Sequence, residues 1–414
     1  MRSVHEALVE LMAAFEPVGV ERAGLLDAHG RFAAEEVVAR SDLPPFDNSV
    51  MDGYALRAGD VAGASEASPV VLPVRGESRA GGALPAPLAV GSAMRIFTGA
   101  PVPEGADAVV VQEDTERDGA QVRIRFASRR GAHVRARASD VAAGSVVLRP
   151  GDPIGPGEIA LLASQRIAAV AVHRRPVVAL LSTGDELRAV DAPEEPGTIV
   201  DSNGYALAAQ VRDAGAIPRV LPIAPDDPEI IRGRLEDALG SDVVLLTGGA
   251  SVGAYDFVHE ALERAGVERQ FWKVRIKPGK PVVFGRRGRV PVVGLPGNPV
   301  SAMVTFEVLV RPALRKMLGD PAPHPEPVAV RLAHDHSRSP GRLELARATL
   351  ARDGEGWTAR LHALQGSGSL RSMAGVDALV IFPSDRDRFV AGELLVAIRL
   401  RRRGSTRSPF EDLA

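Results

Sequence analysis

The pattern of hydrophobic positions changes from helical to strand-like within the first 126 residues. Ser3 and Glu6 have the spacing of a capping box, and the apolar positions after them keep a helical period through Ala14. A second short helix is predicted over residues 31–38, before the proline-containing run 42–46. Short β-rich runs separated by Gly, Pro and Asp then predict a small all-β domain. These runs cover residues 70–74, 94–97, 109–112 and 122–126.

Beyond Pro176 the pattern becomes an alternation of apolar strands and amphipathic helices. Residues 177–181 form a continuous apolar run, which is typical of a buried parallel strand. Asp227 and Asn298 each precede a proline, a pattern that favours a capped helix start. The alternation predicts a doubly wound α/β domain with an open sheet. Its predicted elements are strand 177–181, a helix capped by Ser202 or Asn203 and ending near Gly215, strand 217–223, helix 227–239, strand 243–246, and helix 298–318 with a kink at Pro312.

The last part of the chain, from about residue 326, returns to β-rich runs and predicts a C-terminal β-domain. The arginine-rich tail, residues 402–414, has no periodic apolar pattern and is expected to be disordered. The predicted strands cover residues 328–332, 343–350, 357–364, 379–382 and 394–400.

Length and composition narrow the class of protein. The 414 residues correspond to about three domains, and 45% of them are hydrophobic. A net charge of −2 argues against nucleic-acid binding by a basic surface, and the absence of cysteine excludes thiol catalysis and thiolate metal sites. The first residues carry charge without an apolar h-region, and no segment approaches the roughly 20 apolar residues of a membrane helix. We therefore expect a soluble, cytoplasmic protein without a membrane partner.

The lysines are few and clustered. The chain has 50 Lys and Arg residues, of which only four are Lys, and Lys273, Lys277 and Lys280 lie within eight residues. A general drift towards arginine could explain this by chance. Alternatively, these positions need the compact, strongly hydrated charge of an ammonium, which a guanidinium does not supply.

Three loops follow predicted strands of the α/β domain, where open sheets bind their ligands. Their glycines let backbone N–H groups approach an anion, so the loop residues Ser182, Thr183, Gly184, Gly248, Gly249, Ser251 and Asn298 are candidate substrate contacts. Asp185, Glu186 and Asp256 could hold Mg²⁺ through oxygen ligands, and Lys277 and Lys280 could meet a phosphate. The loop sequences are STGDEL (182–187), TGGASVGAYD (247–256) and GLPGNPVS (294–301).

Each of these features also has a plain structural explanation. Glycine-rich loops are often simple turns, acidic pairs often cap helices, and lysines near turns are usually solvated. Together they favour a phosphate-and-metal site. The chain has no Walker A motif and no Gly-x-Gly-x-x-Gly after a strand, which disfavours an ordinary NTPase or dinucleotide enzyme.

From about residue 4 to residue 400, the sequence resembles the molybdopterin molybdenumtransferase (MoeA) family, which includes the E domain of gephyrin. The three loops above carry the resemblance, together with FDNSVMDGYA (46–55), RIFTGAPVPEGAD (95–107), IKPGKP (276–281), PGR (340–342) and QGSG (365–368).

The resemblance implies a multidomain α/β fold with a doubly wound molybdopterin-binding domain. A small linking domain, an inserted β-rich domain and a C-terminal β-barrel-like domain would complete it. The implied boundaries are residues 1–22 and 174–322 for the α/β domain, 23–43 and 141–173 for the linking domain, 44–140 for the inserted domain and 323–401 for the last.

The implied reaction is a step of molybdenum cofactor biosynthesis. The enzyme would insert molybdate into adenylylated molybdopterin and release AMP with Mg²⁺ present. It would act as a homodimer with a composite active site and could contact molybdopterin adenylyltransferase transiently. Partners other than these, nucleic acid included, are not implied.

The resemblance also assigns roles to individual residues. Asp185, Glu186, Asp226 and Asp256 match acidic positions that bind the cation and position the pyrophosphate. Asp52, Thr98, Arg135 and Asp140 match positions that reach the site from the partner's inserted domain, although Asp52 before Gly53 could also be a plain turn residue. The remaining matched positions contact the pterin phosphate or molybdate, or shape the pocket: Lys273, Lys277, Pro296, Pro299 and Ser367.

The sequence alone leaves two other interpretations of the function possible. The α/β domain resembles the enzymes that adenylylate molybdopterin, but that activity would not need the additional domains. A non-catalytic scaffold or cofactor carrier, as in the structural role of gephyrin, would not need the acidic loops. The sequence therefore favours the molybdenum insertase.

Overall fold

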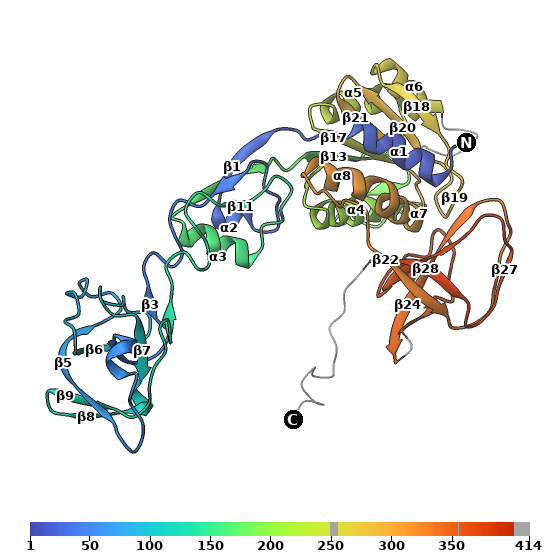
Figure 1. Ribbon diagram of the computed structural model, residues 1–414. Helices are drawn as coiled ribbons and strands as arrows, with labels where there is room; N and C mark the ends of the chain where they lie inside the picture. Colours follow the sequence, from blue (N-terminus) through green and yellow to red (C-terminus); the bar gives the residue numbers. More distant parts are fainter. Residues whose placement is uncertain (249–255, 355, 401–414) are drawn as a thin grey trace.

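The computed structural model describes residues 1–248, 256–354 and 356–400. Figure 1 shows an elongated chain in which an α/β region and a C-terminal barrel lie at one end and a β-rich region at the other. A small region containing β1, β11, α2 and α3 lies between them. Over the described residues, no helix is both long enough and apolar enough to cross a bilayer.

The α/β region is built on a six-stranded sheet with the strand order β16-β13-β17-β21-β20-β18. The first four strands are parallel to one another, and β20 and β18 add in antiparallel fashion. The strands are β13 Val177–Ser182, β16 Ile217–Val220, β17 Val243–Thr247, β18 Glu268–Trp272, β20 Val283–Arg287 and β21 Val290–Leu295. The predicted doubly wound sheet is confirmed.

Helices cover both faces of this sheet. Val178 and Leu180 of β13 pack into one core, and Ala179 and Leu181 pack into the other, as the two-residue period of a strand requires. The first core is covered by α1 Val4–Ala14, α4 Ser202–Asp213, α7 Pro299–Thr305, η3 Phe306–Val310 and α8 Arg311–Met317, and the second by α5 Pro228–Ala238 and α6 Asp256–Arg264.

Three local predictions need correction or refinement. The predicted helix over residues 31–38 is wrong, because Ala33 N donates to Asp152 O and this backbone pairs with distant segments instead. The N-cap of α4 is Asp201, whose carboxylate accepts from Gly204 N at 3.0 Å, and not Ser202 or Asn203. The helix after Asn298 is interrupted by the π-helical turn η3, which immediately precedes Arg311 and Pro312.

The small middle region joins chain segments from both sides of the inserted β-rich region. Strand β1 pairs with β12 and β2 pairs with β11, in both cases antiparallel, and α2 packs against α3. Its elements are β1 Val20–Gly24, α2 Leu25–Ala28, β2 Val37–Val38, β11 Val146–Leu148, α3 Pro156–Ser164 and β12 Ala169–His173.

The β-rich region contains a six-stranded sheet with the order β7-β4-β6-β5-β9-β8. The strands β3 and β10, which precede and follow this sheet in the chain, pair in a separate two-stranded ladder. The elements are β3 Asn48–Ser49, β4 Gly53–Leu56, η1 Ala58–Val61, β5 Val70–Ser78, β6 Ala93–Ile96, β7 Ala108–Val111, η2 Gln112–Asp114, β8 Thr115–Asp118, β9 Gln121–Ile124 and β10 Val134–Arg135. The predicted β-runs in this part of the chain are confirmed.

The C-terminal region is a closed barrel, because β24 pairs with β25 on one side and with β26 on the other. The short strand β19 from the α/β region also pairs with β24 and joins the two regions. The elements are β19 Ile276–Lys277, β22 Pro327–Leu332, β23 His336–Ser337, β24 Leu343–Asp353, β25 Gly356–Leu361, η4 Leu370–Ser372, β26 Ala378–Phe382, β27 Arg388–Phe389 and β28 Leu394–Arg399. The predicted multidomain α/β fold with a barrel-like end is therefore confirmed.

Candidate functional site

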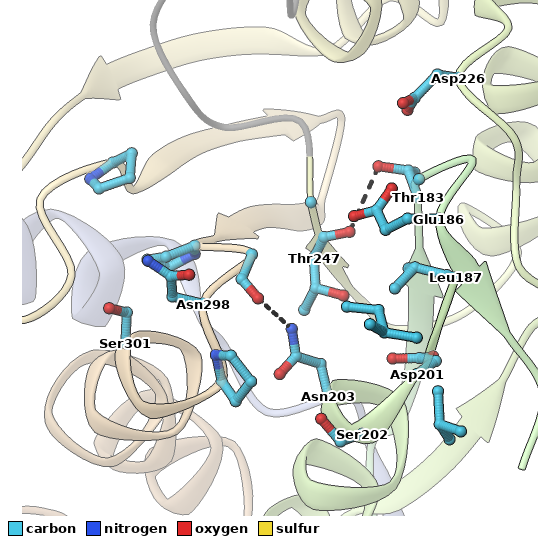
Figure 2. A pocket seen from close by; sticks show the side chains of 18 residues that line it. Thr183, Glu186, Leu187, Asp201, Ser202, Asn203, Asp226, Thr247, Asn298 and Ser301 are labelled. Carbon is cyan, nitrogen blue, oxygen red and sulfur yellow. Dashed lines mark hydrogen bonds between the residues drawn. The ribbon is translucent and has the colours of Figure 1, made fainter. Parts of the chain in front are cut away.

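A pocket of about 360 Å³ opens at the carboxyl ends of β13, β17 and β21. This is the edge where open α/β sheets bind ligands. Figure 2 shows Glu186 and Asp226 on the same side as Thr183, and Asn298 and Ser301 on the opposite wall. The lining residues are Thr183, Gly184, Glu186, Leu187, Ile199, Val200, Asp201, Ser202, Asn203, Asp226, Thr247, Gly248, Pro281, Pro296, Gly297, Asn298, Pro299 and Ser301.

The floor of the pocket is held by hydrogen bonds between the ends of β13 and β17. Thr183 N donates to Thr247 O at 2.9 Å, and Thr247 Oγ1 donates to Ser182 Oγ at 3.1 Å. Gly248 has a φ of +95°, and a Cβ there would lie 2.2 Å from Thr183 O. Only glycine fits this backbone approach, which gives Gly248 a structural reason apart from its predicted contact with substrate.

The charge of the pocket is negative. Within the described part of the chain its lining includes Glu186, Asp201 and Asp226, but no Lys, Arg or His. Asp201 is already engaged as the N-cap of α4. Burial, and then the neighbouring charges of Asp185 and Glu186, raise the pKa of Asp226 above the usual range of an aspartate.

This surplus of carboxylates fits a hard cation, which would offset the burial and the neighbouring charges that raise the pKa of Asp226. Asp185 Oδ1 accepts from Asp226 N at 3.0 Å, so the two acidic loops are tied together. A Cβ on Gly184 would lie 2.5 Å from Glu186 Oε2, which shows how closely that carboxylate folds back on its own loop. No group of three or more metal-ligating side chains is preassembled among the residues that the structure describes.

The opposite wall of the pocket is the loop between β21 and α7. Asn203 Nδ2 donates to Gly297 O at 2.7 Å, and Asn298 Nδ2 donates to Ser367 Oγ at 3.0 Å. Val300 N also donates to Ser367 O at 3.1 Å. The barrel residue Ser367 therefore lies beside the pocket and helps to fix its wall.

The three clustered lysines do not line the pocket. Lys273 Nζ lies 3.8 Å from the centre of the Trp272 ring, and Lys277 Nζ lies 3.0 Å from Glu344 Oε1. Lys280 is exposed. Burial raises the pKa of Glu344, but His336 and the Lys277 ammonium outweigh burial and lower that pKa to about 2. Lys277 thus remains half-exposed while paired with an ionised carboxylate of the barrel.

Four further predicted site residues, Asp52, Thr98, Arg135 and Asp140, form two separate pairs in or beside the β-rich region. Figure 1 shows this region at the opposite end of the molecule from the α/β region that contains the pocket. Asp52 Oδ1 accepts from Thr98 N at 2.8 Å and from Thr98 Oγ1 at 2.7 Å. These two hydrogen bonds lower the pKa of Asp52 below its usual range. Arg135 and Asp140 form an exposed ion pair at 3.0 Å. The chain itself does not bring these four predicted site residues to the pocket.

Three predicted site residues lie at or beyond the edge of the described residues. Gly249 and Ser251 lie outside the described residues. The structure describes Asp256 only as the first residue of α6 and not its side chain, so its metal role stays a prediction.

The sequence reasoning missed several lining residues. Leu187, Ile199 and Val200 form an apolar wall through the short ladder of β14 Leu187–Arg188 and β15 Ile199–Val200. Nothing in the sequence marked these residues as pocket-forming. Asn203 is one of only three asparagines in the chain, a scarcity that could have marked it, and its contact with Gly297 explains the amide at this position.

Comparisons with known families agree with this architecture along the whole chain. Residues 2–165 match the family model described as "MoeA N-terminal region (domain I and II)", and residues 179–316 match "Probable molybdopterin binding domain". Residues 329–400 match "MoeA C-terminal region (domain IV)".

Curated relatives and solved structures are similar over nearly the same length. Molybdopterin molybdenumtransferase 2 of Mycobacterium tuberculosis is 40% identical over 406 residues, covering 95% of this chain and 98% of the relative. A molybdopterin molybdenumtransferase of Nostoc is 38% identical, covering 90% and 87%. The crystal structure of a molybdopterin biosynthesis MoeA protein from Pyrococcus horikosii superimposes with a TM-score of 0.84 at 33% identity, covering 97% and 99%. The chain belongs to the molybdopterin molybdenumtransferase (MoeA) family.

Proposed function

We propose that this protein is a molybdenum insertase of molybdenum cofactor biosynthesis. The substrates are adenylylated molybdopterin and molybdate, and AMP is the released product. The observation that carries the proposal is the acidic pocket at the strand ends of a chain similar over its whole length to enzymes named molybdopterin molybdenumtransferase.

The pocket needs a positive charge before it can accept a pyrophosphate. Glu186 and Asp226 face the cavity without a basic residue among its described lining, and a second anion would add to the repulsion. We assign the Mg²⁺ site to Asp185, Glu186, Asp226 and Asp256. When bound, Mg²⁺ supplies charge neutralisation at the phosphate oxygens. Asp185 keeps the Asp226 loop in place through the main-chain hydrogen bond at 3.0 Å.

The rest of the pocket binds and orients the substrate. Thr183, Ser301 and Asn298 offer polar groups, and Leu187 and Ile199 offer an apolar wall. Lys273, Lys277, Lys280 and Ser367 lie on the segments that flank the pocket, where ammonium and hydroxyl groups suit the pterin phosphate or molybdate. The assignment of Lys277 is supported by its half-exposed ammonium, which can contact an anion while it stays paired with Glu344.

We also infer that the active enzyme is a homodimer. Arg135 lies in β10, Asp52 and Thr98 lie beside β4 and β6, and Asp140 pairs with Arg135. Figure 1 shows these strands at the opposite end of the chain from the α/β region that contains the pocket. A two-fold dimer that places the β-rich region over the partner's pocket would build two identical composite sites. The sheet and barrel groupings support the four-domain division expected from the sequence.

The proposal is tested by AMP release from adenylylated molybdopterin with Mg²⁺, with and without molybdate. We expect release that depends on molybdate and is lost when EDTA removes the cation. A parallel reaction with ATP and molybdopterin tests adenylyl transfer. Equal AMP release without molybdate, or formation of the adenylylated pterin from ATP, would contradict the insertase assignment.

A further inference from the structure

Arg95 lies near Asp52 in the β-rich region and contacts two aromatic rings. It lies on β6, directly opposite Tyr54 of β4 in the antiparallel register. Its guanidinium carbon is 5.2 Å from the centre of the Tyr54 ring and 4.8 Å from the centre of the Phe97 ring. The planar cation is thus held by two aromatic rings, and the Phe97 ring directly precedes Thr98 in the chain.

The same guanidinium closes a ring of hydrogen bonds around Asp52. One nitrogen, Nη1, donates to Gly53 O at 3.1 Å, and the other, Nη2, donates to Gln112 Oε1 at 2.8 Å. Gln112 N in turn donates to Asp52 O at 3.0 Å. Arg95 therefore bonds Gly53, which follows Asp52 in the chain, and Gln112, whose N–H bonds the Asp52 carbonyl.

The backbone next to Asp52 leaves little room for adjustment. A Cβ on Gly53 would lie 2.0 Å from Val110 O, so β4 and β7 approach each other closely at this point. The Asp52 carboxylate is held by Thr98 on one side, while its main chain is held through Gly53 and Gln112 on the other. Arg95 bonds the main-chain side directly and, on the other side, contacts the ring of Phe97, the residue before Thr98.

We propose that Arg95 is a positioning residue that fixes the Asp52 carboxylate in the orientation needed by the composite active site. This inference rests on the proposed function, in which Asp52 acts at the partner's pocket. The position needs an arginine, because two donors on different nitrogens and a flat face for two rings are used at once. Lysine offers a single ammonium without a planar face.

The test compares Arg95→Met and Arg95→Lys with a matched control, Arg57→Met. Arg57 follows β4 and donates through Nε to Gly105 O at 3.0 Å, so it also bonds a main-chain carbonyl of this region without bonding Asp52, Gly53 or Gln112. We expect Arg95→Met to lower kcat of molybdate-dependent AMP release about tenfold or more, because small misplacements of an oriented group are costly. The KM for adenylylated molybdopterin and the melting temperature should stay close to those of Arg57→Met, and Arg95→Lys should recover part of kcat.

A subunit-mixing experiment distinguishes positioning of Asp52 from a general effect. Arg95→Met subunits mixed with Asp256→Asn subunits should regain activity, because the defect belongs to the Asp52 half of the site. An Arg95→Met enzyme with the kcat of Arg57→Met would overturn the inference, as would a loss of kcat matched by unfolding or by failure to complement Asp256→Asn.

Asp52→Ala separates this inference from the proposed function. If Asp52→Ala retains wild-type activity, the proposed role of Asp52 is wrong, and the inference about Arg95 is overturned with it. If Asp52→Ala is inactive while Arg95→Met is as active as the control, the proposed function stands and only the role of Arg95 is lost.

Discussion

Asp226 and Asp52 show how two regions of one chain treat an acidic side chain differently. Asp226 lies in the α/β pocket, where burial and the charges of Asp185 and Glu186 raise its pKa. Asp52 lies in the β-rich region, where two hydrogen bonds from Thr98 lower its pKa. Among the described residues, no basic side chain lines the pocket of the first carboxylate, whereas the second has its hydrogen-bond donors in place.

This difference indicates which half of the proposed site depends on a ligand. Asp226 is half-buried beside the exposed carboxylates of Asp185 and Glu186, a setting that favours its protonation or the binding of a cation. Asp52 stays ionised and oriented through its own chain. The α/β pocket would therefore respond to Mg²⁺, whereas Asp52 would respond to changes in its hydrogen-bond partner Thr98.

The largest expected effect comes from a subunit-mixing experiment, in which one variant carries a defect in the β-rich region and the other a defect in the α/β region. Asp52→Ala and Asp256→Asn should each lower AMP release about a hundredfold, as the loss of one oriented catalytic group can do. A mixed dimer has one site with both defects and one site with neither. With random exchange about half of the dimers are mixed, so activity should return to roughly a quarter of the wild-type level. No recovery, once mass spectrometry has verified mixed dimers, would mean that each site is built from one chain.

A smaller effect is expected from a change confined to the acidic pocket. Glu186→Gln should lower AMP release at least about tenfold, because it removes one charge from the proposed cation site while keeping the shape. It should also raise the Mg²⁺ concentration needed for half-maximal activity. Asp213→Asn, an exposed carboxylate at the end of α4, is the control and should behave as wild type. An unchanged Mg²⁺ requirement in Glu186→Gln would remove this residue from the metal site.

The lysine between the α/β region and the barrel gives a third measurement. Lys277→Ala should weaken binding of the phosphorylated pterin several-fold, about 1 kcal/mol, as expected for one partly solvated charge contact. Lys277→Arg should recover binding only in part, because the larger planar group cannot place its charge at the same point beside Glu344. Isothermal titration of the pterin measures both. Full recovery by arginine would contradict a specific need for lysine at this position.

The sequence predicted the parts of this site that depend on local patterns. The strand-end loops could be located because strand periodicity and glycine spacing are local properties, and the need for glycine at position 248 follows from one backbone approach. The capping box of Ser3 and Glu6 is likewise local, and the structure contains both of its hydrogen bonds.

Other features could not be predicted because they depend on distant segments. Residues 31–38 have a helical pattern, but the backbone of Ala33 is bonded to Asp152, and such tertiary pairing overrides propensity. The contact of Asn298 with Ser367 joins segments 69 residues apart. The pairing of Lys277 with Glu344 depends on β19 joining the barrel. Local patterns contain no information about these contacts.

The smallest expected effect concerns stability and tests the comparison most directly. The raised pKa of Asp226 means that the folded protein binds this proton more tightly than the unfolded chain does, so ionisation at neutral pH opposes folding. Asp226→Asn should therefore raise the melting temperature by about 1–2 °C at pH 7.5 in Mg²⁺-free buffer. The gain should shrink as the pH falls towards 4, where the wild-type carboxyl becomes protonated. Adding Mg²⁺ should stabilise the wild type more than the variant, because a bound cation favours the folded state.

Asp52→Asn should instead lower the melting temperature at pH 7.5. The lowered pKa of Asp52 stabilises the folded protein at pH values above the pKa of the unfolded chain, and that contribution is lost as the pH falls through the folded pKa. A melting temperature of Asp226→Asn at or below that of the wild type in Mg²⁺-free buffer would show that Asp226 has its compensating charge within the chain.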